Sequence, residues 1–278
     1  MRIGGGIEKP YTNPDEWIAL VKDLNYSAVL MPVKYDATKE EKKDYLDYIN
    51  KYNLVIGEAG VWRNPISIDE TERKIALDYC KKQLTLADEL GANCCVNIAG
   101  ARGEKWAGFY KENYWPETYA LIVDTVRDII DSVNPKNTFY TIEPMPWMTP
   151  DTPDAYLKLL KAVDRKAFAV HLDFTNMINT PYKYVYRTEF ISECFEKLGP
   201  YIKSIHIKDV TMREVYPCSI EECMPGQGTV DYVKVLRLTE GLGKETTAFV
   251  EHLDTYEEYK VAVRYVRGIA DTAGVTII

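Results

Sequence analysis

The chain has 278 residues, of which 46% are hydrophobic and 27% are charged. This composition is typical of a globular protein, and the length suits one large domain, which we expect to span residues 1–278. The formal net charge of −8 disfavours a nucleic acid or an anionic membrane as the partner.

Targeting signals and cysteine usage narrow the class of protein further. No run of 18 apolar residues is present, so we expect no transmembrane helix. The N-terminal segment lacks the basic and apolar stretches of a signal peptide. The six cysteines show no CxxC spacing. We therefore expect a cytoplasmic protein with reduced, mostly buried thiols.

In the first half of the chain, short apolar runs alternate with longer amphipathic segments. The expected strands cover residues 1–7, 27–33, 54–62 and 94–100. Asn13 and Pro14 open the first expected helix, because asparagine is a good N-cap and proline fits the first helical position. The next expected helices cover residues 38–53, a long segment that ends at Leu90 before Gly91, and 115–132.

The second half of the chain repeats this alternation. Its expected strands cover 139–145, 168–174, 202–210 and 247–253, and its expected helices cover 152–163, 188–199, a segment from Asp231, and 256–274. Continuous apolar runs are typical of parallel strands that are covered on both faces. Eight strands that alternate with eight helices predict a single (β/α)8 TIM barrel. A doubly wound open sheet is the alternative, but no GxGxxG motif supports dinucleotide binding.

Four consecutive expected strands carry an acidic residue or a histidine near their carboxyl ends. These residues are Glu143, Asp173, His206 and Glu251. Active sites of TIM barrels lie at the carboxyl ends of the strands, so the four side chains are expected to converge. Three carboxylates and one imidazole suit a single divalent cation, Mn²⁺ first, with Mg²⁺, Co²⁺ and Zn²⁺ as alternatives.

Each of these residues also has a plain structural interpretation. A single glutamate at a strand end often forms a salt bridge, and a single strand histidine is often a core residue. The metal site is favoured because all four polar side chains lie at the same depth in apolar strands. Burying them there without a common ligand would cost much free energy.

Alternation of side chains along a strand assigns directions to the neighbouring residues. Lys208 shares a face with His206 and is expected to point into the barrel, as an electrostatic helper in catalysis. His171 shares a face with Asp173 but lies deeper, where it is expected to hydrogen bond to a ligand residue. His252 is expected to face the helices and to be structural.

The segments TIEPMPW, VHLDFTN, SIHIKD, PGQGTVDY and VEHL resemble the xylose isomerase-like TIM barrel superfamily, in its branch of sugar phosphate isomerases and epimerases. The resemblance implies the metal ligands Glu143, Asp173, His206 and Glu251. It also implies that Glu143 and Glu251 are the acid and base that move a proton beside a carbonyl, through an enediolate. The endonuclease branch of the superfamily is excluded, because the chain has only three histidines.

Two positions differ from the epimerases that the sequence resembles. Those enzymes usually carry a histidine where this chain has Asn176. They also tend to carry an arginine downstream of the histidine that corresponds to His206, and Arg213 is the candidate for it here. Both are therefore candidate substrate-binding residues, as is His171. The other candidates at strand ends and in loops are Glu58, Arg102, Trp106 and Trp147, and packing within a loop is an equally good interpretation of each tryptophan.

These observations predict a metal-dependent isomerase or epimerase of a sugar or polyol ketone. A lyase or dehydratase that acts on a keto-sugar, an inosose or a keto-glycoside is the first alternative, because the same site suits an elimination. A non-catalytic sugar-binding barrel is the second. The expected partner is a small sugar-derived molecule, and analogy with other barrels suggests a homodimer or homotetramer, with a partner subunit as a further alternative.

Overall fold

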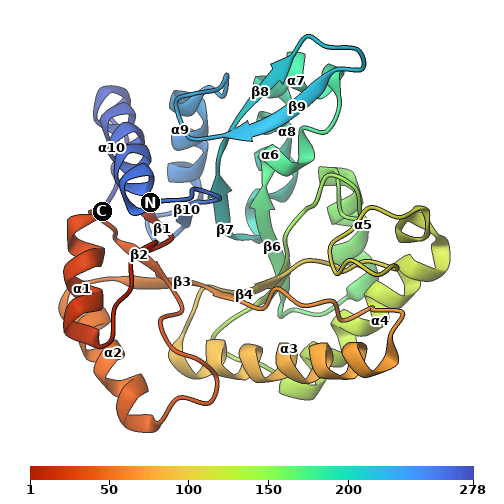
Figure 1. Ribbon diagram of the computed structural model, residues 1–278, viewed down its shortest axis with the longest axis horizontal. Helices are drawn as coiled ribbons and strands as arrows, with labels where there is room; N and C mark the ends of the chain where they lie inside the picture. The colour runs from red at the N-terminus through yellow and green to blue at the C-terminus, as the bar shows by residue number, and fades with distance from the viewer.

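The computed structural model describes residues 1–278 and contains a barrel of eight parallel strands (Figure 1). The strands run in the order β1-β10-β7-β6-β5-β4-β3-β2. Their bounds are β1 Arg2–Gly5, β2 Ala28–Leu30, β3 Val55–Gly60, β4 Cys94–Asn97, β5 Tyr140–Ile142, β6 Phe168–Asp173, β7 Ile202–Ile207 and β10 Thr247–Val250. The two end strands meet where Ser27 N–H donates to Ile3 O at 2.8 Å. The barrel is therefore nearly closed, and the predicted (β/α)8 fold is confirmed.

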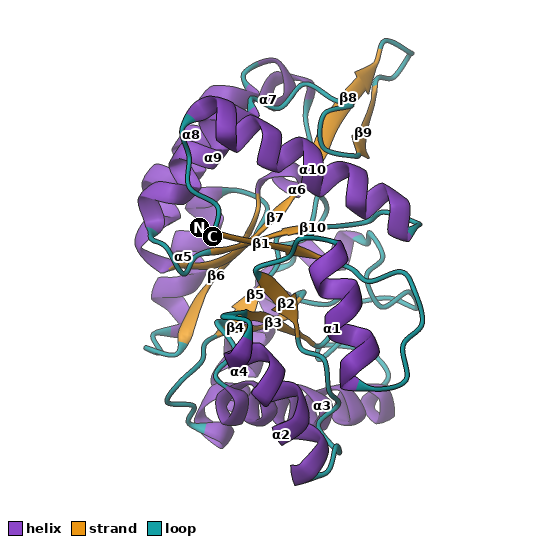
Figure 2. Cartoon of the chain, turned by 90° about the vertical axis from the view of Figure 1, so that its left-hand side faces the viewer, coloured by secondary structure: helices purple, strands orange, loops and turns teal.

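Helices surround the strands on the outside of the barrel (Figure 2). The long helices are α1 Pro14–Asp23, α2 Lys39–Lys51, α3 Glu70–Leu90, α4 Pro116–Val133, α5 Pro153–Val163, α8 Arg187–Leu198, α9 Tyr232–Leu242 and α10 Tyr256–Ala273. Two short helices, α6 Phe174–Met177 and α7 Pro181–Val185, follow β6. Asn13 caps α1 with its side chain, and Gly91 ends α3 in a left-handed conformation, as the sequence predicts.

The structure contains an antiparallel hairpin after β7 that the sequence analysis does not predict. It consists of β8 Asp209–Arg213 and β9 Ser219–Cys223, and it projects from the carboxyl end of the barrel (Figures 1 and 2). The expected strand 202–210 is therefore too long, because β7 ends at Ile207. The buried Asp209 carboxylate anchors the base of the hairpin, since it accepts hydrogen bonds from the backbone N–H groups of Gly226 and Val230.

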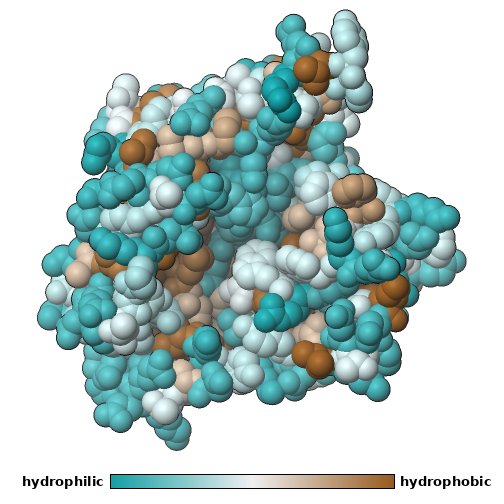
Figure 3. Space-filling model, viewed as in Figure 1, coloured by the Kyte–Doolittle hydropathy of each residue, from teal (hydrophilic) through white to brown (hydrophobic).

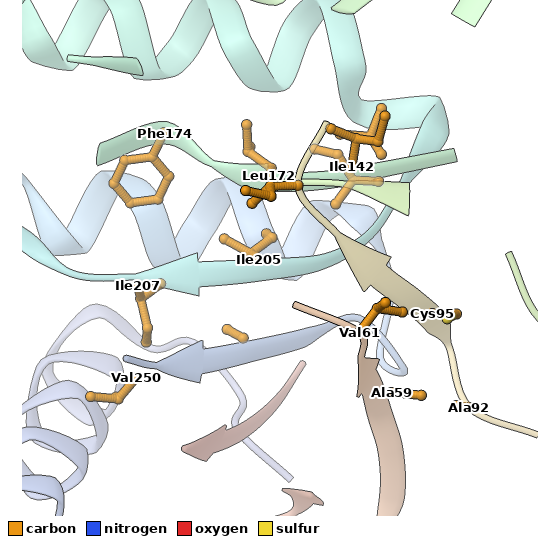
Figure 4. Packing of buried hydrophobic residues seen from close by; sticks show 14 of the residues in the cluster. Ala59, Val61, Ala92, Cys95, Ile142, Leu172, Phe174, Ile205, Ile207 and Val250 are labelled. Atoms are coloured by element: carbon orange, nitrogen blue, oxygen red, sulfur yellow. The ribbon is translucent and has the colours of Figure 1, made fainter. Parts of the chain in front are cut away.

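The apolar core lies mainly between the strands and the helices. Leu172, Ile205 and Ile207 belong to this packed layer, and Figure 4 shows them beside the strands that also carry the site. Because alternate residues point to opposite faces, His171, Asp173 and the other polar members of these strands are left facing the barrel interior.

Phe249 fills the interior of the barrel below its carboxyl end. Its ring lies where only glycine fits: a Cβ added at Gly4 would lie 2.5 Å from the ring, and one added at Gly57 would lie 2.6 Å from its Cζ atom. Phe249 is 1% exposed, so the barrel is closed at this depth by an aromatic ring and not by polar groups.

Two further predictions concern cysteines and membranes. Cys94 and Cys95 are fully buried in β4, which agrees with the prediction of core packing. None of the helices is both long enough and apolar enough to cross a lipid bilayer.

Candidate metal centre

Four side chains that could ligate a metal converge at the carboxyl end of the barrel. Glu143 follows β5, Asp173 ends β6, His206 lies in β7 and Glu251 follows β10. One potential ligand atom from each lies within 4.8 Å of the others. The structure therefore brings together all four residues of the predicted metal set.

His206 stands at the centre of this group. Its Nδ1 atom lies 3.0 Å from Glu143 Oε1, 3.1 Å from Glu251 Oε2 and 3.8 Å from Asp173 Oδ2. Glu143, Asp173 and His206 are buried, whereas the Glu251 side chain is 18% exposed. The cluster thus opens toward solvent on the side of Glu251.

Lys208 points into the same cluster, as alternation along the strand predicts. Its Nζ atom lies 2.8 Å from Asp173 Oδ2 and 3.0 Å from Glu251 Oε2, and the side chain is 1% exposed. A third carboxylate, that of Glu222 in β9, lies 3.1 Å from the same nitrogen. The ammonium group is therefore surrounded by acceptors and has little capacity left for a further anion.

The donor set fits a divalent cation. Asp173 Oδ2 and Glu251 Oε2 are buried and accept no well-directed hydrogen bond, although Lys208 lies close enough to pair with both electrostatically. Oxygens with free lone pairs that face a common point, next to an imidazole nitrogen, are suitable ligands for Mn²⁺ or Mg²⁺. A divalent cation would also balance the negative charge of these carboxylates, for which Lys208 is the only lysine in contact.

The charges within the cluster shift the pKa of each member. Burial raises the pKa of Asp173, but Lys208 outweighs this effect and holds the pKa below its usual value. Burial likewise opposes the ionisation of Glu251, but His206 and Lys208 lower its pKa. Glu143 differs, because burial and the neighbouring Glu251 raise its pKa. Glu143 is thus the carboxylate of the cluster most ready to accept a proton.

A second layer of polar side chains lies directly beneath His206. Glu58 in β3 is 1% exposed, and its Oε2 atom lies 3.2 Å from His206 Nε2. Its Oε1 atom lies 3.0 Å from His171 Nε2 and accepts a hydrogen bond from the Ser204 hydroxyl. Burial raises the pKa of Glu58, but the two histidines outweigh this effect and lower it. Since a carboxylate only accepts, His206 donates from Nε2 to Glu58, and without a metal its Nδ1 atom donates to Glu143. To ligate a metal, the ring would give up the proton on Nδ1 and keep the one on Nε2.

This layer changes the interpretation of two predicted residues. The sequence predicts that Glu58 follows its strand, at the mouth of the barrel. In the structure Glu58 lies within β3 and beneath the cluster. His171 is fully buried and contacts Glu58, at the deeper level that alternation predicts. Its Nδ1 atom has no hydrogen-bond partner, whereas its Nε2 atom lies within hydrogen-bond distance of Glu58.

Asn176 connects three elements of the site. Its Nδ2 atom lies 3.3 Å from Glu143 Oε1, its Oδ1 atom accepts from Lys208 Nζ at 3.1 Å, and its backbone N–H donates to Asp173 Oδ1. The short helix α6 places it there, because the helix begins directly after Asp173. Asn176 therefore holds the orientation of both Glu143 and Lys208.

The prediction that His252 faces the helices is wrong. β10 ends at Val250, and His252 has a left-handed backbone with φ of 54°, so strand alternation no longer applies. The imidazole is 54% exposed at the carboxyl end of the barrel, with Nδ1 2.9 Å from Glu222 Oε1. The sequence offered no signal for Glu222, since it lies in the hairpin that was expected to be a loop.

A cavity of about 560 Å³ opens beside the cluster, and Figure 3 shows a hollow near the middle of the face. Trp106 lines this cavity, as do Glu58, Glu143, His206 and Glu251.

The other predicted substrate-binding side chains lie elsewhere. Arg102 donates to the carbonyl groups of Ile66 and Ser67 and lines a separate hollow. Arg213 forms an ion pair with Glu221 on the hairpin. Trp147 donates to Ala107 O at 2.8 Å and borders a neighbouring hollow, which Asn176 also lines.

The xylose isomerase-like TIM barrel family matches residues 18–277, which is nearly the whole chain. The chain belongs to this family. No curated protein sequence matches the chain significantly.

Solved structures of xylose isomerase-like barrels share the fold at low sequence identity. A xylose isomerase-like protein from Mycobacterium smegmatis, in complex with magnesium, has a TM-score of 0.68 and 19% identity, with 97% of this chain and 92% of that chain covered. D-Psicose 3-epimerase from Clostridium cellulolyticum H10, with D-tagatose, has a TM-score of 0.67 and 12% identity, with 99% and 98% covered. A probable 3-DHS dehydratase from Bacillus anthracis has a TM-score of 0.71 and 16% identity, with 95% and 98% covered.

Proposed function

We propose that the protein is a divalent-metal-dependent isomerase or epimerase of a sugar or polyol ketone. The observation that carries the proposal is the convergence of Glu143, Asp173, His206 and Glu251 at the carboxyl end of the barrel. Mn²⁺ is the proposed metal, and the magnesium in the M. smegmatis structure supports an ion of this class. The epimerases among the structural neighbours support the type of reaction.

The residues of the site divide the work of such a reaction. When bound, the metal ion supplies Lewis-acid polarisation of the substrate carbonyl and stabilises negative charge on its oxygen. Glu143 is the proposed base, because its carboxylate lines the cavity beside His206 and can accept a proton from carbon. Glu251 also lines the cavity, with Oε2 3.1 Å from His206 Nδ1, and is the proposed partner that returns a proton.

Lys208 and Asn176 keep these groups in place. Lys208 contacts Asp173 and Glu251, and Asn176 contacts Lys208 and Glu143. A buried ammonium group near developing negative charge also lowers the barrier to proton abstraction. Preorganised contacts of this kind reduce the reorganisation that the reaction needs.

An elimination catalysed by the same residues is the second candidate. The observation that favours it is His252, whose exposed imidazole stands at the rim of the cavity next to Glu251. An imidazole in this place suits the protonation of a leaving group one carbon away from the removed proton. The B. anthracis neighbour, a probable dehydratase, has the same fold.

Hydrogen exchange on carbon tests both candidates. The Mn²⁺-loaded protein is incubated in D₂O with ketoses, inososes and keto-glycosides, and deuterium on carbon is measured by NMR and mass spectrometry. The expected result is deuterium beside the carbonyl, lost when EDTA removes the metal. A product of unchanged skeleton then indicates an isomerase or epimerase, and a product that has lost water or a group indicates a lyase. Exchange that persists in EDTA contradicts the proposed role of the metal.

A further inference from the structure

The cavity at the carboxyl end of the barrel has two chemically different sides. The potential metal ligands come from β5, β6, β7 and β10, which are neighbours in the barrel. The side formed by β2, β3, β4 and the loops that follow them, together with the segment after β5, is mainly apolar, and Glu58 and Gln83 are its polar members. Its apolar members are Leu30, Met31, Trp62, Ile98, Trp106 and Met145.

Large apolar side chains on this side are accessible within the hollow. Leu30 is 41% exposed and Trp106 is 45% exposed. Trp62 has a left-handed backbone with φ of 53°, and its ring lies against Gly60, where an added Cβ would clash with the indole nitrogen. A concave apolar surface that adjoins a polar centre is typical of a pocket that binds part of a ligand. The volume of about 560 Å³ falls within the range of pockets that hold ligands larger than a single small sugar.

Carboxylates outnumber the possible cations of the cavity, which are the imidazoles of His206 and His252. Glu8, Glu58, Glu143 and Glu251 line it, and no lysine or arginine does. Lys208, the nearest ammonium group, is 1% exposed and already contacts three carboxylates. A phosphate group would therefore meet several carboxylates and would find no lysine or arginine side chain in the cavity to bind it.

We propose that the substrate is an uncharged carbonyl compound in which a flat hydrophobic group adjoins the hydroxylated part. The carbonyl end lies toward His206 and Glu251, and the hydrophobic group lies against Trp106 and Leu30. The proposed substrate carries no phosphate group, because no lysine or arginine lines the cavity. This inference rests on the proposed function for the placement of the carbonyl, but the apolar side and the charge of the cavity stand independently of it.

Binding of matched neutral probes tests the inference without turnover. Isothermal titration calorimetry on the Mn²⁺-loaded protein compares phenyl β-D-glucopyranoside with methyl β-D-glucopyranoside, which differ only in the hydrophobic group. We expect the phenyl compound to bind about tenfold more tightly, because an aromatic contact adds to the burial of apolar area. We also expect fructose 6-phosphate to bind more weakly than fructose.

Two tryptophan variants show whether the preference arises in this cavity. Trp106→Ala should abolish the phenyl preference. Trp115→Ala is the matched control, since Trp115 has a similar exposure of 48% but lines a different hollow. Circular dichroism confirms that each variant folds. Equal binding of the two glucosides, tighter binding of the phosphate, or a preference that survives in Trp106→Ala overturns the inference.

The outcome separates this inference from the proposed function. If simple ketoses exchange deuterium and the two glucosides bind equally, the proposed reaction is supported and the hydrophobic subsite is contradicted. If the phenyl preference depends on Trp106 but no ketone exchanges deuterium, the subsite is supported and the proposed reaction is contradicted.

Discussion

Replacing Glu58 with glutamine keeps the shape of the side chain but removes the negative charge beneath His206. In the wild type, one carboxylate oxygen accepts from His206 Nε2, and the other contacts His171 Nε2 and the Ser204 hydroxyl. A carboxamide has only one oxygen, so it cannot accept on both sides. If its NH₂ group faces His206, the ring must carry its proton on Nδ1, which then cannot bind a metal.

The opposite orientation of the amide costs less. His171 has an unpartnered Nδ1 and can move its proton there, so that its Nε2 accepts from the NH₂ group. The amide oxygen then keeps the hydrogen bond from His206, but the charge that makes the imidazole a stronger ligand is lost. Changes of this kind next to a ligand histidine cost about 10- to 100-fold in metal affinity. At about 1.4 kcal/mol per tenfold, this equals about 1.4 to 2.8 kcal/mol of binding free energy.

Isothermal titration of Mn²⁺ into chelator-treated protein measures this loss directly. Ser204→Ala is the matched control, because it removes one donor to Glu58 but leaves the contact between Glu58 and His206. We expect the control to bind Mn²⁺ as the wild type does. Wild-type affinity in Glu58→Gln would refute the reasoning, and an equal loss in both variants would show that packing, and not the charge beneath His206, is responsible.

Three further substitutions test the site, the barrel interior and the hairpin. Glu251→Gln should reduce deuterium exchange on carbon by about 10²- to 10⁴-fold, the usual contribution of a general acid or base, as NMR would measure. Gly57→Ala should destabilise the protein by about 1 to 3 kcal/mol in urea unfolding, because the new Cβ would clash with the Phe249 ring, only 2.6 Å from its Cζ atom. Asp209→Ala leaves three backbone N–H groups without their acceptor and should expose residues 209–230 to faster amide hydrogen exchange.

The barrel strands could be predicted because they are buried on both faces. Each appears in the sequence as a continuous apolar run, and the structure places a strand within every expected range. The hairpin escaped prediction because its strands lie outside the barrel and lack such a run. Ser219–Cys223, for example, contains two glutamates and is only partly buried. Its position depends on the contacts of Asp209 with distant backbone groups, which no local pattern reveals.

The metal cluster could also be predicted, since carboxylates at the ends of apolar strands stand out. The role of Glu58 could not, because the facing of its side chain depends on an irregularity in β3. The pairing with β2 shifts between Ile56 and Glu58, which leaves Gly57 as an extra residue. A bulge of this kind reorients the following side chain relative to simple alternation. Glu58 therefore points at His206 for a reason that lies in the pairing of two strands and not in its own sequence.

His252 illustrates the same limit at the end of a strand. Alternation assigns opposite faces to Glu251 and His252 only while the backbone stays extended, and the chain leaves that conformation at His252. A left-handed histidine is uncommon, and it persists where surrounding contacts compensate for its cost. Here the imidazole lies 2.9 Å from Glu222, and burial of Glu222 is offset by His252 and Lys208, which lower its pKa. The hairpin that the sequence did not reveal thus fixes the conformation of a residue that the sequence placed on the wrong face, and both lie at the rim of the candidate metal centre.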